Sequence, residues 1–240
     1  MLVNTKALVI STVKYAEADL IVKCFTKSSG IKSYMLKGVL KSKKGKLRAS
    51  YFQPLSLLEI TAFHKNKGSL EYLKEVKVDY PFKSLHNNVV KSSLVLFLSE
   101  VLKQSIIEEE PNESLYSFLE EAFKWLDENE SYANFHILFL LKLTEFLGFS
   151  PDASTINKPI FNPVEGVFQH DISNIYCVEI TPENKGITHL FGIKFDEIKT
   201  LKLTKKQRQN TLDILLLYFE LHIQGFKKPK SLAVLHQIFN

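Results

Sequence analysis

The 240-residue chain is poor in cysteine, with only Cys24 and Cys177, which lie far apart in the sequence. This scarcity argues against a disulfide framework and favours a reducing compartment. Two cysteines cannot complete a structural zinc site, and the seven histidines include no His-Glu-x-x-His pair. We therefore expect no bound metal, no cofactor and a cytoplasmic location.

Long hydrophobic runs are also missing. The longest, from Phe135 to Leu141, is soon interrupted by Lys142 and Glu145, short of the roughly 20 apolar residues that a membrane span needs. The N-terminal segment MLVNTKALVIST lacks the charged leader and apolar stretch of a signal peptide, so none is expected. With 45% apolar residues and no internal repeat, the chain is expected to be globular, with one large core or two modest ones.

Negative charge is absent from residues 37–48, KGVLKSKKGKLR, which carry six cations: Lys37, Lys41, Lys43, Lys44, Lys46 and Arg48. Cations on a flexible tether suit an extended polyanion better than one small phosphate, although a merely solvated loop is the alternative. The wider charge distribution favours a polyanion. Residues 1–82 hold 15 Lys or Arg against 6 Asp or Glu, or +9, whereas residues 83–240 hold 16 against 20, or −4, and these sum to the overall +5.

Short runs rich in β-branched and aromatic residues predict five β-strands in the first third of the chain. They are residues 7–13, 20–25, 31–36, 54–63 and 70–78. Tight links at Ser28-Ser29-Gly30 and Asn66-Lys67-Gly68 predict two hairpins. Five strands in about 80 residues, with a long connection after the third, are typical of an OB-type barrel, although an SH3-like barrel would produce a similar pattern.

Helical periodicity begins after Pro81, at residues 89–106 and 113–128, and residues 131–147 are apolar nearly all round, which predicts the buried centre of a bundle. Residues 152–198 gain proline and glycine, which predicts a loop-rich insert with short strands at 167–169 and 176–180. Thr204 is a predicted N-cap for a helix that runs to Gly225, and a short helix follows at 231–239. The predicted fold class is α+β, with a barrel domain at residues 1–82 and a mainly helical domain at 83–240.

Catalytic signatures are weak. Gly38 and the Gly45-Lys46 pair resemble a phosphate-binding loop only superficially, since six residues separate the glycines and Leu47 stands where Ser or Thr should bind magnesium. His136, on an apolar helix, is expected to be a core histidine. The acidic runs at 108–110 and 127–130 lie at predicted helix ends, where water solvates them. The sequence therefore predicts a protein that is not an enzyme.

Nucleic-acid binding by a barrel requires cations that follow the phosphates and exposed aromatic rings that stack on bases. Tyr15, in a predicted turn beside Lys14, is the best surface candidate in the basic module, whereas Phe52 is expected in the core and Tyr34 could take either position. Secondary candidates for phosphate contacts are Lys14, Lys23, Lys27 and Lys32, some of which must face away from any one groove.

Several short segments, spread over the whole chain, occur in a specific order and spacing. They are Ala7-Leu8-Val9, residues 15–22, the hairpin at 26–30, Lys37-Gly38, Gln53-Pro54, residues 146–149, and Lys230-Ser231-Leu232 leading to Phe239. Together they resemble the bacterial RecO family of recombination mediators and DNA-repair proteins. The resemblance implies a non-enzymatic, nucleoid-associated protein that binds single- and double-stranded DNA, anneals strands coated with single-strand-binding protein, and works with RecR to load RecA.

The chain departs from the family pattern in the insert, where many members carry a four-cysteine zinc site. Here Thr155, Asn157, His170 and Cys177 lie in that neighbourhood and cannot complete such a site. We therefore expect no zinc and an insert that its own packing holds together. The expected anchors are Phe161, Val167, Phe168, Ile175 and Tyr176.

The resemblance also implies that the helical body binds the acidic C-terminal tail of the single-strand-binding protein, which ends in an aromatic residue and a free carboxylate. A receptor for such a tail needs an apolar pocket bordered by cations. Lys205 with Arg208, and Lys227 with Lys228, are the two candidate clusters. We favour the first, because Arg208 can grip a carboxylate with two parallel hydrogen bonds, although a solvated face is the alternative.

Two other functions stay open at this point. One is an RNA-binding OB-fold factor, since a barrel that follows the backbone distinguishes DNA from RNA only weakly. The other is an interaction scaffold, whose cations contact an acidic partner surface and which binds little nucleic acid.

Overall fold

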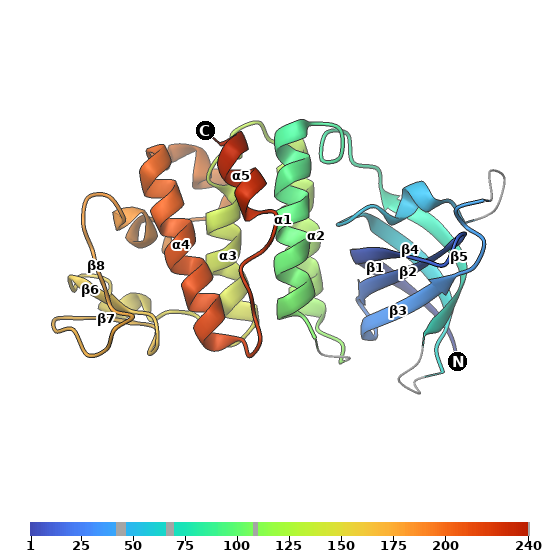
Figure 1. Ribbon diagram of the computed structural model, residues 1–240, viewed down its shortest axis with the longest axis horizontal. Coiled ribbons are helices and arrows are strands. Elements are labelled where there is room, and N and C mark those ends of the chain that lie inside the picture. Colours follow the sequence, from blue (N-terminus) through green and yellow to red (C-terminus); the bar gives the residue numbers. More distant parts are fainter. Residues whose placement is uncertain (42–46, 66–69, 108–109, 240) are drawn as a thin grey trace. The chain divides into compact units, whose positions relative to one another are not determined.

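The computed structural model describes residues 1–41, 47–65, 70–107 and 110–239 (Figure 1). It contains two compact units, Met1–Glu128 and Asn129–Asn240, which we describe separately as the N-terminal and C-terminal units. The N-terminal unit extends past the sequence division at residues 82/83, because helix α1 (Val89–Ser105) packs against strand β1 (Leu2–Tyr15). Among the described residues, every helix is too short or too polar to cross a membrane.

Five strands close into a barrel in the order β1-β2-β3-β5-β4, and β4 pairs back onto β1. The remaining strands are β2 (Asp19–Thr26), β3 (Gly30–Leu36), β4 (Leu57–Phe63) and β5 (Glu71–Tyr80). All neighbours are antiparallel except β3 and β5, whose parallel pairing closes the barrel. This order confirms the OB type. Strand β1 is longer than predicted because its first half pairs with β4 and its second half with β2.

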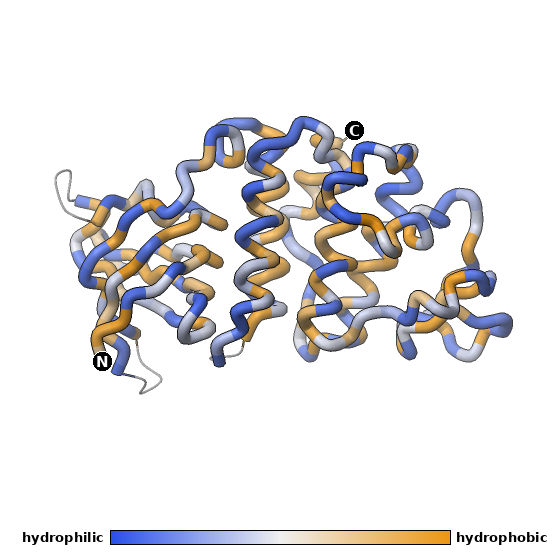
Figure 2. Tube along the Cα trace, turned by 180° about the vertical axis from the view of Figure 1, so that it is seen from behind, coloured by the Kyte–Doolittle hydropathy of each residue, from blue (hydrophilic) through white to orange (hydrophobic). Residues whose placement is uncertain are grey.

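Buried residues that fill the barrel interior alternate with more exposed ones along much of β2, β4 and β5. Figure 2 shows hydrophobic and hydrophilic positions in close succession along the barrel. Phe52 is buried there, as expected. Tyr34 is also fully buried, and its hydroxyl lies 2.9 Å from Nε2 of His64. The sequence left open whether Tyr34 lies in the core or on the surface. Because its side chain is buried, it is a core residue and is not available to stack on bases.

Helices α1 and α2 (Glu113–Glu128) complete the N-terminal unit, and α2 has the bounds that the sequence predicted. Asn88 begins α1, since its side chain accepts hydrogen bonds from the backbone N–H groups of Val90 and Lys91. The ring of Tyr116 on α2 lies 6.1 Å from that of Phe25 on β2. Helix α2 therefore contributes to the apolar surface beside the barrel.

The C-terminal unit contains helices α3 (Phe135–Phe146), α4 (Lys205–His222) and α5 (Leu232–Ile238). Residues 135–141 of α3 are all buried, which confirms this helix as the centre of the unit. Thr204 caps α4 as predicted: its hydroxyl accepts the backbone N–H of Gln207, whose side chain in turn accepts the N–H of Thr204.

The insert carries a three-stranded sheet in the order β7-β6-β8. Its strands are β6 (Ile160–Asn162), β7 (Val167–Gln169) and β8 (Val178–Glu179). The sequence did not predict β6, which is too short between Pro159 and Pro163 to show a strand period. Phe161 and Phe168 are buried against Ile187, Ile214 and Tyr218, as expected for anchors.

Two predicted anchors of the insert are wrong. Ile175 is 91% exposed and Tyr176 is 41% exposed. Both lie in the connection between β7 and β8, outside the three short strands, so no neighbouring strand covers them.

Candidate nucleic-acid interface

The beginning of the basic loop, at residues 37–41, is attached to the turn between β1 and β2. The backbone N–H of Gly38 donates to Oδ1 of Asp19 at 2.7 Å, and that of Leu40 donates to the carbonyl of Ala18 at 3.0 Å. Lys41 Nζ lies 3.0 Å from Oε2 of Glu17, although both side chains are exposed and such a pair contributes little stability. Lys37 and Lys41 are therefore presented beside this turn, with both side chains exposed.

The other end of the loop is held by a short 3₁₀ helix, Ala49–Phe52. Phe52 enters the barrel core, and its carbonyl accepts the hydroxyl of Thr12 at 2.7 Å. Arg48, just before this helix, is exposed. Lys43, Lys44 and Lys46 lie outside the described residues, between these two fixed ends.

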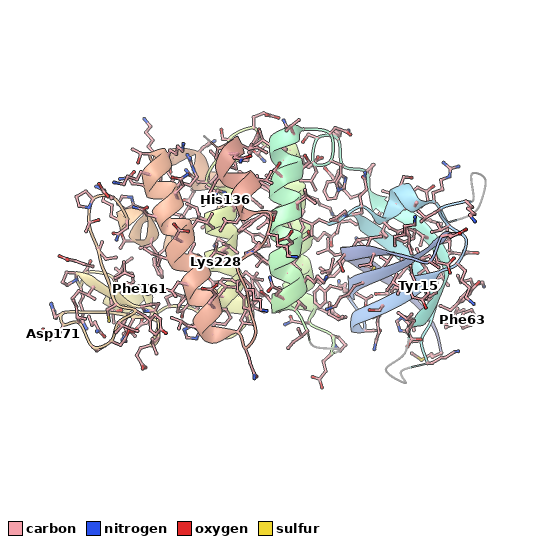
Figure 3. All side chains as sticks on the ribbon, viewed as in Figure 1. Tyr15, Phe63, His136, Phe161, Asp171 and Lys228 are labelled. Atoms are coloured by element: carbon pink, nitrogen blue, oxygen red, sulfur yellow. The ribbon has the colours of Figure 1, made fainter. Side chains whose placement is uncertain are left out.

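Three further residues were predicted to bind DNA: Lys14, Tyr15 and Lys32. The structure places the first two at the end of β1, beside the attached part of the basic loop. Lys14 and Tyr15 are both exposed there, and Tyr15 (52% exposed) is paired across the strands with Asp19, the residue that holds Gly38. Figure 3 labels Tyr15 on the barrel. Lys32 does not join them, because it is only 9% exposed and shares the inward side of β3 with Tyr34.

Sequence reasoning missed two exposed aromatic residues, Phe63 at the end of β4 and Tyr72 near the start of β5. Phe63 is 41% exposed and Tyr72 is 60% exposed, and the register pairs them directly. For Tyr72 the available signal was its position next to Leu73, since adjacent residues of a strand face opposite sides and Leu73 is the apolar core candidate. For Phe63 the sequence carried no such signal, because it ends its strand.

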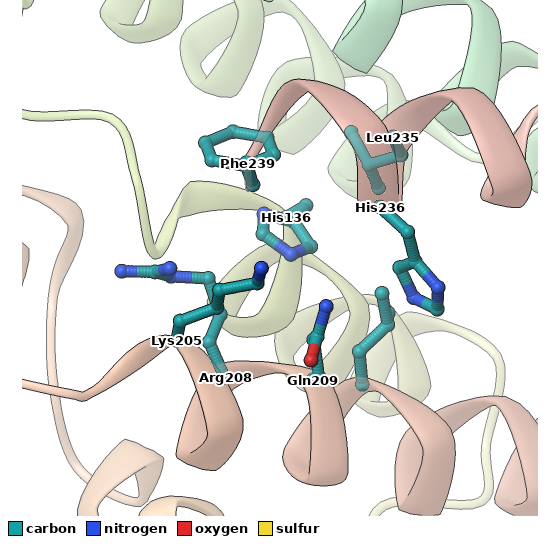
Figure 4. A pocket seen from close by; sticks show the side chains of 8 residues that line it. His136, Lys205, Arg208, Gln209, Leu235, His236 and Phe239 are labelled. Carbon is teal, nitrogen blue, oxygen red and sulfur yellow. The ribbon is translucent and has the colours of Figure 1, made fainter.

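The C-terminal unit has a small pocket between the start of α4, α3 and α5 (Figure 4). Arg208 is fixed there, since its Nε donates to Oδ1 of Asn134 at 3.0 Å, and its guanidinium lies 5.8 Å from the ring centre of Phe239. The Phe239 ring also stacks on His136 at 5.4 Å. The free space has a volume of about 10 Å³, enough for about one water molecule.

Of the four cations predicted to bind a partner, Lys205 and Arg208 line this pocket. Lys227 and Lys228, which follow α4, are exposed and are not among its lining residues. His136 is buried as expected, and burial, with smaller effects of the charges on Arg208 and His236, lowers its pKa to about 3. The imidazole of His136 is therefore uncharged at physiological pH and lines one side of the pocket.

Within the described residues, no group of three or more His, Cys, Asp or Glu side chains is placed to hold a metal ion. Cys24 is enclosed in the barrel, where burial raises the pKa of its thiol to about 12. Of the four residues of the insert that were considered for a zinc site, Thr155 accepts the backbone N–H of Phe168 at 2.9 Å. Cys177 instead takes part in a hydrogen-bonded group of polar side chains with Gln169 and Ser173.

The closed barrel and its basic surface define the class of the protein: an OB-fold protein whose barrel precedes a helical region. Residues 1–82 match the family model described as Recombination protein O N terminal, and residues 86–233 match Recombination protein O C terminal. Over the full length of both chains, it is 51% identical to the DNA repair protein RecO of Christiangramia forsetii, 49% to that of Flavobacterium psychrophilum and 31% to that of Porphyromonas gingivalis. The chain belongs to the RecO family, and its role is in recombination and DNA repair.

Proposed function

We propose that this protein is a non-enzymatic recombination mediator whose barrel binds single- and double-stranded DNA through its phosphates. In this role it anneals strands coated with single-strand-binding protein and, with RecR, helps to load RecA. The observation that carries the proposal is the basic loop at residues 37–48, attached at both ends to an OB barrel in a member of the RecO family. Cations on a loop that is attached to the barrel at both ends can contact successive phosphates of a nucleic acid, whatever its base sequence.

The test is the salt dependence of binding to labelled single-stranded DNA. Because each neutralised phosphate releases counterions, changing Lys41, Lys43, Lys44 and Lys46 together to Ala should flatten the slope of log K against log salt, by up to about 0.7 per lost contact. A matched control removes the same charge from exposed lysines of the C-terminal unit, Lys185, Lys194, Lys199 and Lys202. An unchanged slope in the loop variant, or an equal change in the control, would contradict the proposal.

Membership in a DNA-repair family favours DNA over RNA as the ligand. Affinities for single-stranded DNA and RNA of equal length, compared at the same salt concentration, distinguish these two. Weak binding to both at low salt would instead support the interaction scaffold.

The helical body binds the acidic tail of the single-strand-binding protein at the Arg208 pocket. What supports this site is a space that already accommodates an aromatic ring between His136 and the guanidinium of Arg208, with Lys205 at its edge. A fluorescent tail peptide should bind Arg208→Ala at least several-fold more weakly than wild type, because the bidentate contact to its carboxylate is lost. The double variant Lys227→Ala with Lys228→Ala is the control, and a loss of binding only in that variant would move the site to the second cluster.

A further inference from the structure

A continuous row of apolar side chains winds around the outside of the barrel, since it begins at Val13 on β1 and ends at Phe63 on β4, whose partner on β1 is Leu2. The register aligns Val13 with Ile21, Ile21 with Met35, Met35 with Tyr72, and Tyr72 with Phe63, so the row passes from β1 through β2, β3 and β5 to β4. Val13, Tyr72 and Phe63 are more than one third exposed, and Ile21 and Met35 are half-buried. The residues beside them along the strands, Leu20, Leu36, Leu73 and Ala62, are buried in the core.

The two aromatic rings of the row are placed so that each keeps an open side. The centres of the Phe63 and Tyr72 rings lie 6.3 Å apart with their planes tilted by 33°, so neither ring covers the face of the other. Tyr15 adds a third exposed ring, two residues beyond Val13 on β1. Figure 3 labels Tyr15 and Phe63 on the barrel. Phe63 and Tyr72 form an exposed aromatic pair, and Met35 is paired with Tyr72 on the neighbouring strand.

Lysines accompany the row at four of its five positions, within β2 and β5 and just after the ends of β3 and β4. Two residues after each row position come Lys23 after Ile21, Lys37 after Met35, Lys74 after Tyr72 and Lys65 after Phe63. Lys37, Lys65 and Lys74 are exposed, and Lys23 is half-buried. Since β2 and β4 run opposite to β3 and β5, these lysines fall on both sides of the row.

We propose that this row is a stacking platform for unpaired bases and that the flanking lysines neutralise the phosphates between them. The ligand class is single-stranded nucleic acid, because the bases of a duplex are already stacked and present no open face. The inference rests on the proposed DNA-binding function and adds to it a surface that distinguishes single strands from duplexes. A protein partner would need an apolar strip with acidic groups on both sides, whereas a single strand supplies bases and phosphates in that arrangement along its whole length.

The test is the double variant Phe63→Ala with Tyr72→Ala, measured by anisotropy with labelled oligothymidylate and with a duplex of equal length. Loss of two stacking rings should weaken oligothymidylate binding by roughly tenfold or more, and leave duplex binding within about twofold. The salt slope should stay the same, because stacking releases no counterions. In Tyr72→Trp, affinity should be retained and the emission of the new indole should fall on binding of oligothymidylate but not of duplex.

Val78→Ala is the matched control, since Val78 is also an exposed apolar residue of β5 but lies outside the row. Its affinity for both probes should equal that of wild type. Wild-type affinity for oligothymidylate in the double variant overturns the inference while leaving the proposed function intact, and favours a protein partner for the row. Equal losses on single strand and duplex also overturn it. A wild-type protein that binds neither probe overturns the proposed function itself, and the inference with it.

Discussion

At the scale of single residues, Asp127 on α2 organises the chain segment that leaves the barrel. Its carboxylate accepts the backbone N–H groups of Lys83, Ser84 and Leu85 at distances of 2.7 to 3.0 Å. The fully buried Lys91 donates to the Ser84 hydroxyl and to the carbonyl of Asp127. Burial by itself would raise the pKa of Asp127, but these hydrogen bonds outweigh it and lower the pKa below its usual value.

Asp127→Ala should lower the free energy of unfolding by about 3 kcal/mol, because it leaves three backbone donors, including the buried N–H of Leu85, without their acceptor. The lowered pKa also makes stability depend on pH. The contribution is complete above the pKa of an unfolded aspartate, near about 4, and is lost as the pH falls through the lower folded value. Urea unfolding at several pH values checks both points, with Asp127→Asn as the shape-matched control. Equal acid sensitivity of wild type and Asp127→Asn would contradict this account.

Gly166 is a second residue whose identity the structure explains. Its φ is +68°, and a Cβ at this position would lie 2.5 Å from the hydroxyl oxygen of Tyr218 on α4. Gly166→Ala should therefore lower the melting temperature of the protein more than Gly192→Ala, where φ is +76° but no atom lies within 4 Å of the added Cβ. Both variants place a Cβ on a residue with positive φ, so the difference between them reports mainly the clash with Tyr218. Equal melting temperatures would show that Tyr218 moves aside at little cost.

At the scale of elements, α5 is weakly attached, since Leu235 is the only one of its seven residues that is buried. Phe239, at its C-terminal end, occupies the space between His136 and Arg208 in which the tail of a partner is proposed to bind. Ring and tail cannot both be present, because the free volume is only about 10 Å³.

Phe239→Ala should therefore strengthen binding of the fluorescent tail peptide several-fold, since the peptide no longer has to displace a ring. Val234→Ala is the control, because it removes an exposed apolar side chain from the same helix. Weaker binding by Phe239→Ala would mean that the ring forms part of the binding surface rather than competing for it.

At the scale of the whole molecule, the insert is held together by polar and aromatic side chains. Asn162 is buried and donates to Gln169 and Ser173, while Asn174 donates back to it at 3.0 Å. Cys177 joins this group through Gln169 and Ser173. Beneath it, Phe161 and Phe168 pack with ring centres 4.9 Å apart.

We expect the purified protein to contain no stoichiometric zinc and its melting temperature to be unchanged by a chelator, because these hydrogen bonds and the two aromatic rings hold the insert together. Elemental analysis and thermal melting with and without EDTA check this. One zinc per chain, or a clear drop of the melting temperature in EDTA, would contradict it.

The sequence by itself determined the features that depend on residues close together along the chain. Strand alternation and the helical stripes identified all five barrel strands and the bounds of α2, and the turn residues placed the N-cap at Thr204, because each depends on a few consecutive residues. Charge counting likewise located the basic module, since net charge does not depend on how the chain folds.

Only the tertiary structure decided what depends on pairing between distant segments. The parallel pairing of β3 with β5 distinguishes the OB barrel from the SH3-like barrel. The same register aligned Tyr72 with Phe63 and Met35 and turned Lys32 inward. Closure of a barrel sets the stagger of every strand at once, so a shift of one residue would move all of these side chains to the opposite face, and no local pattern in the sequence carries that information.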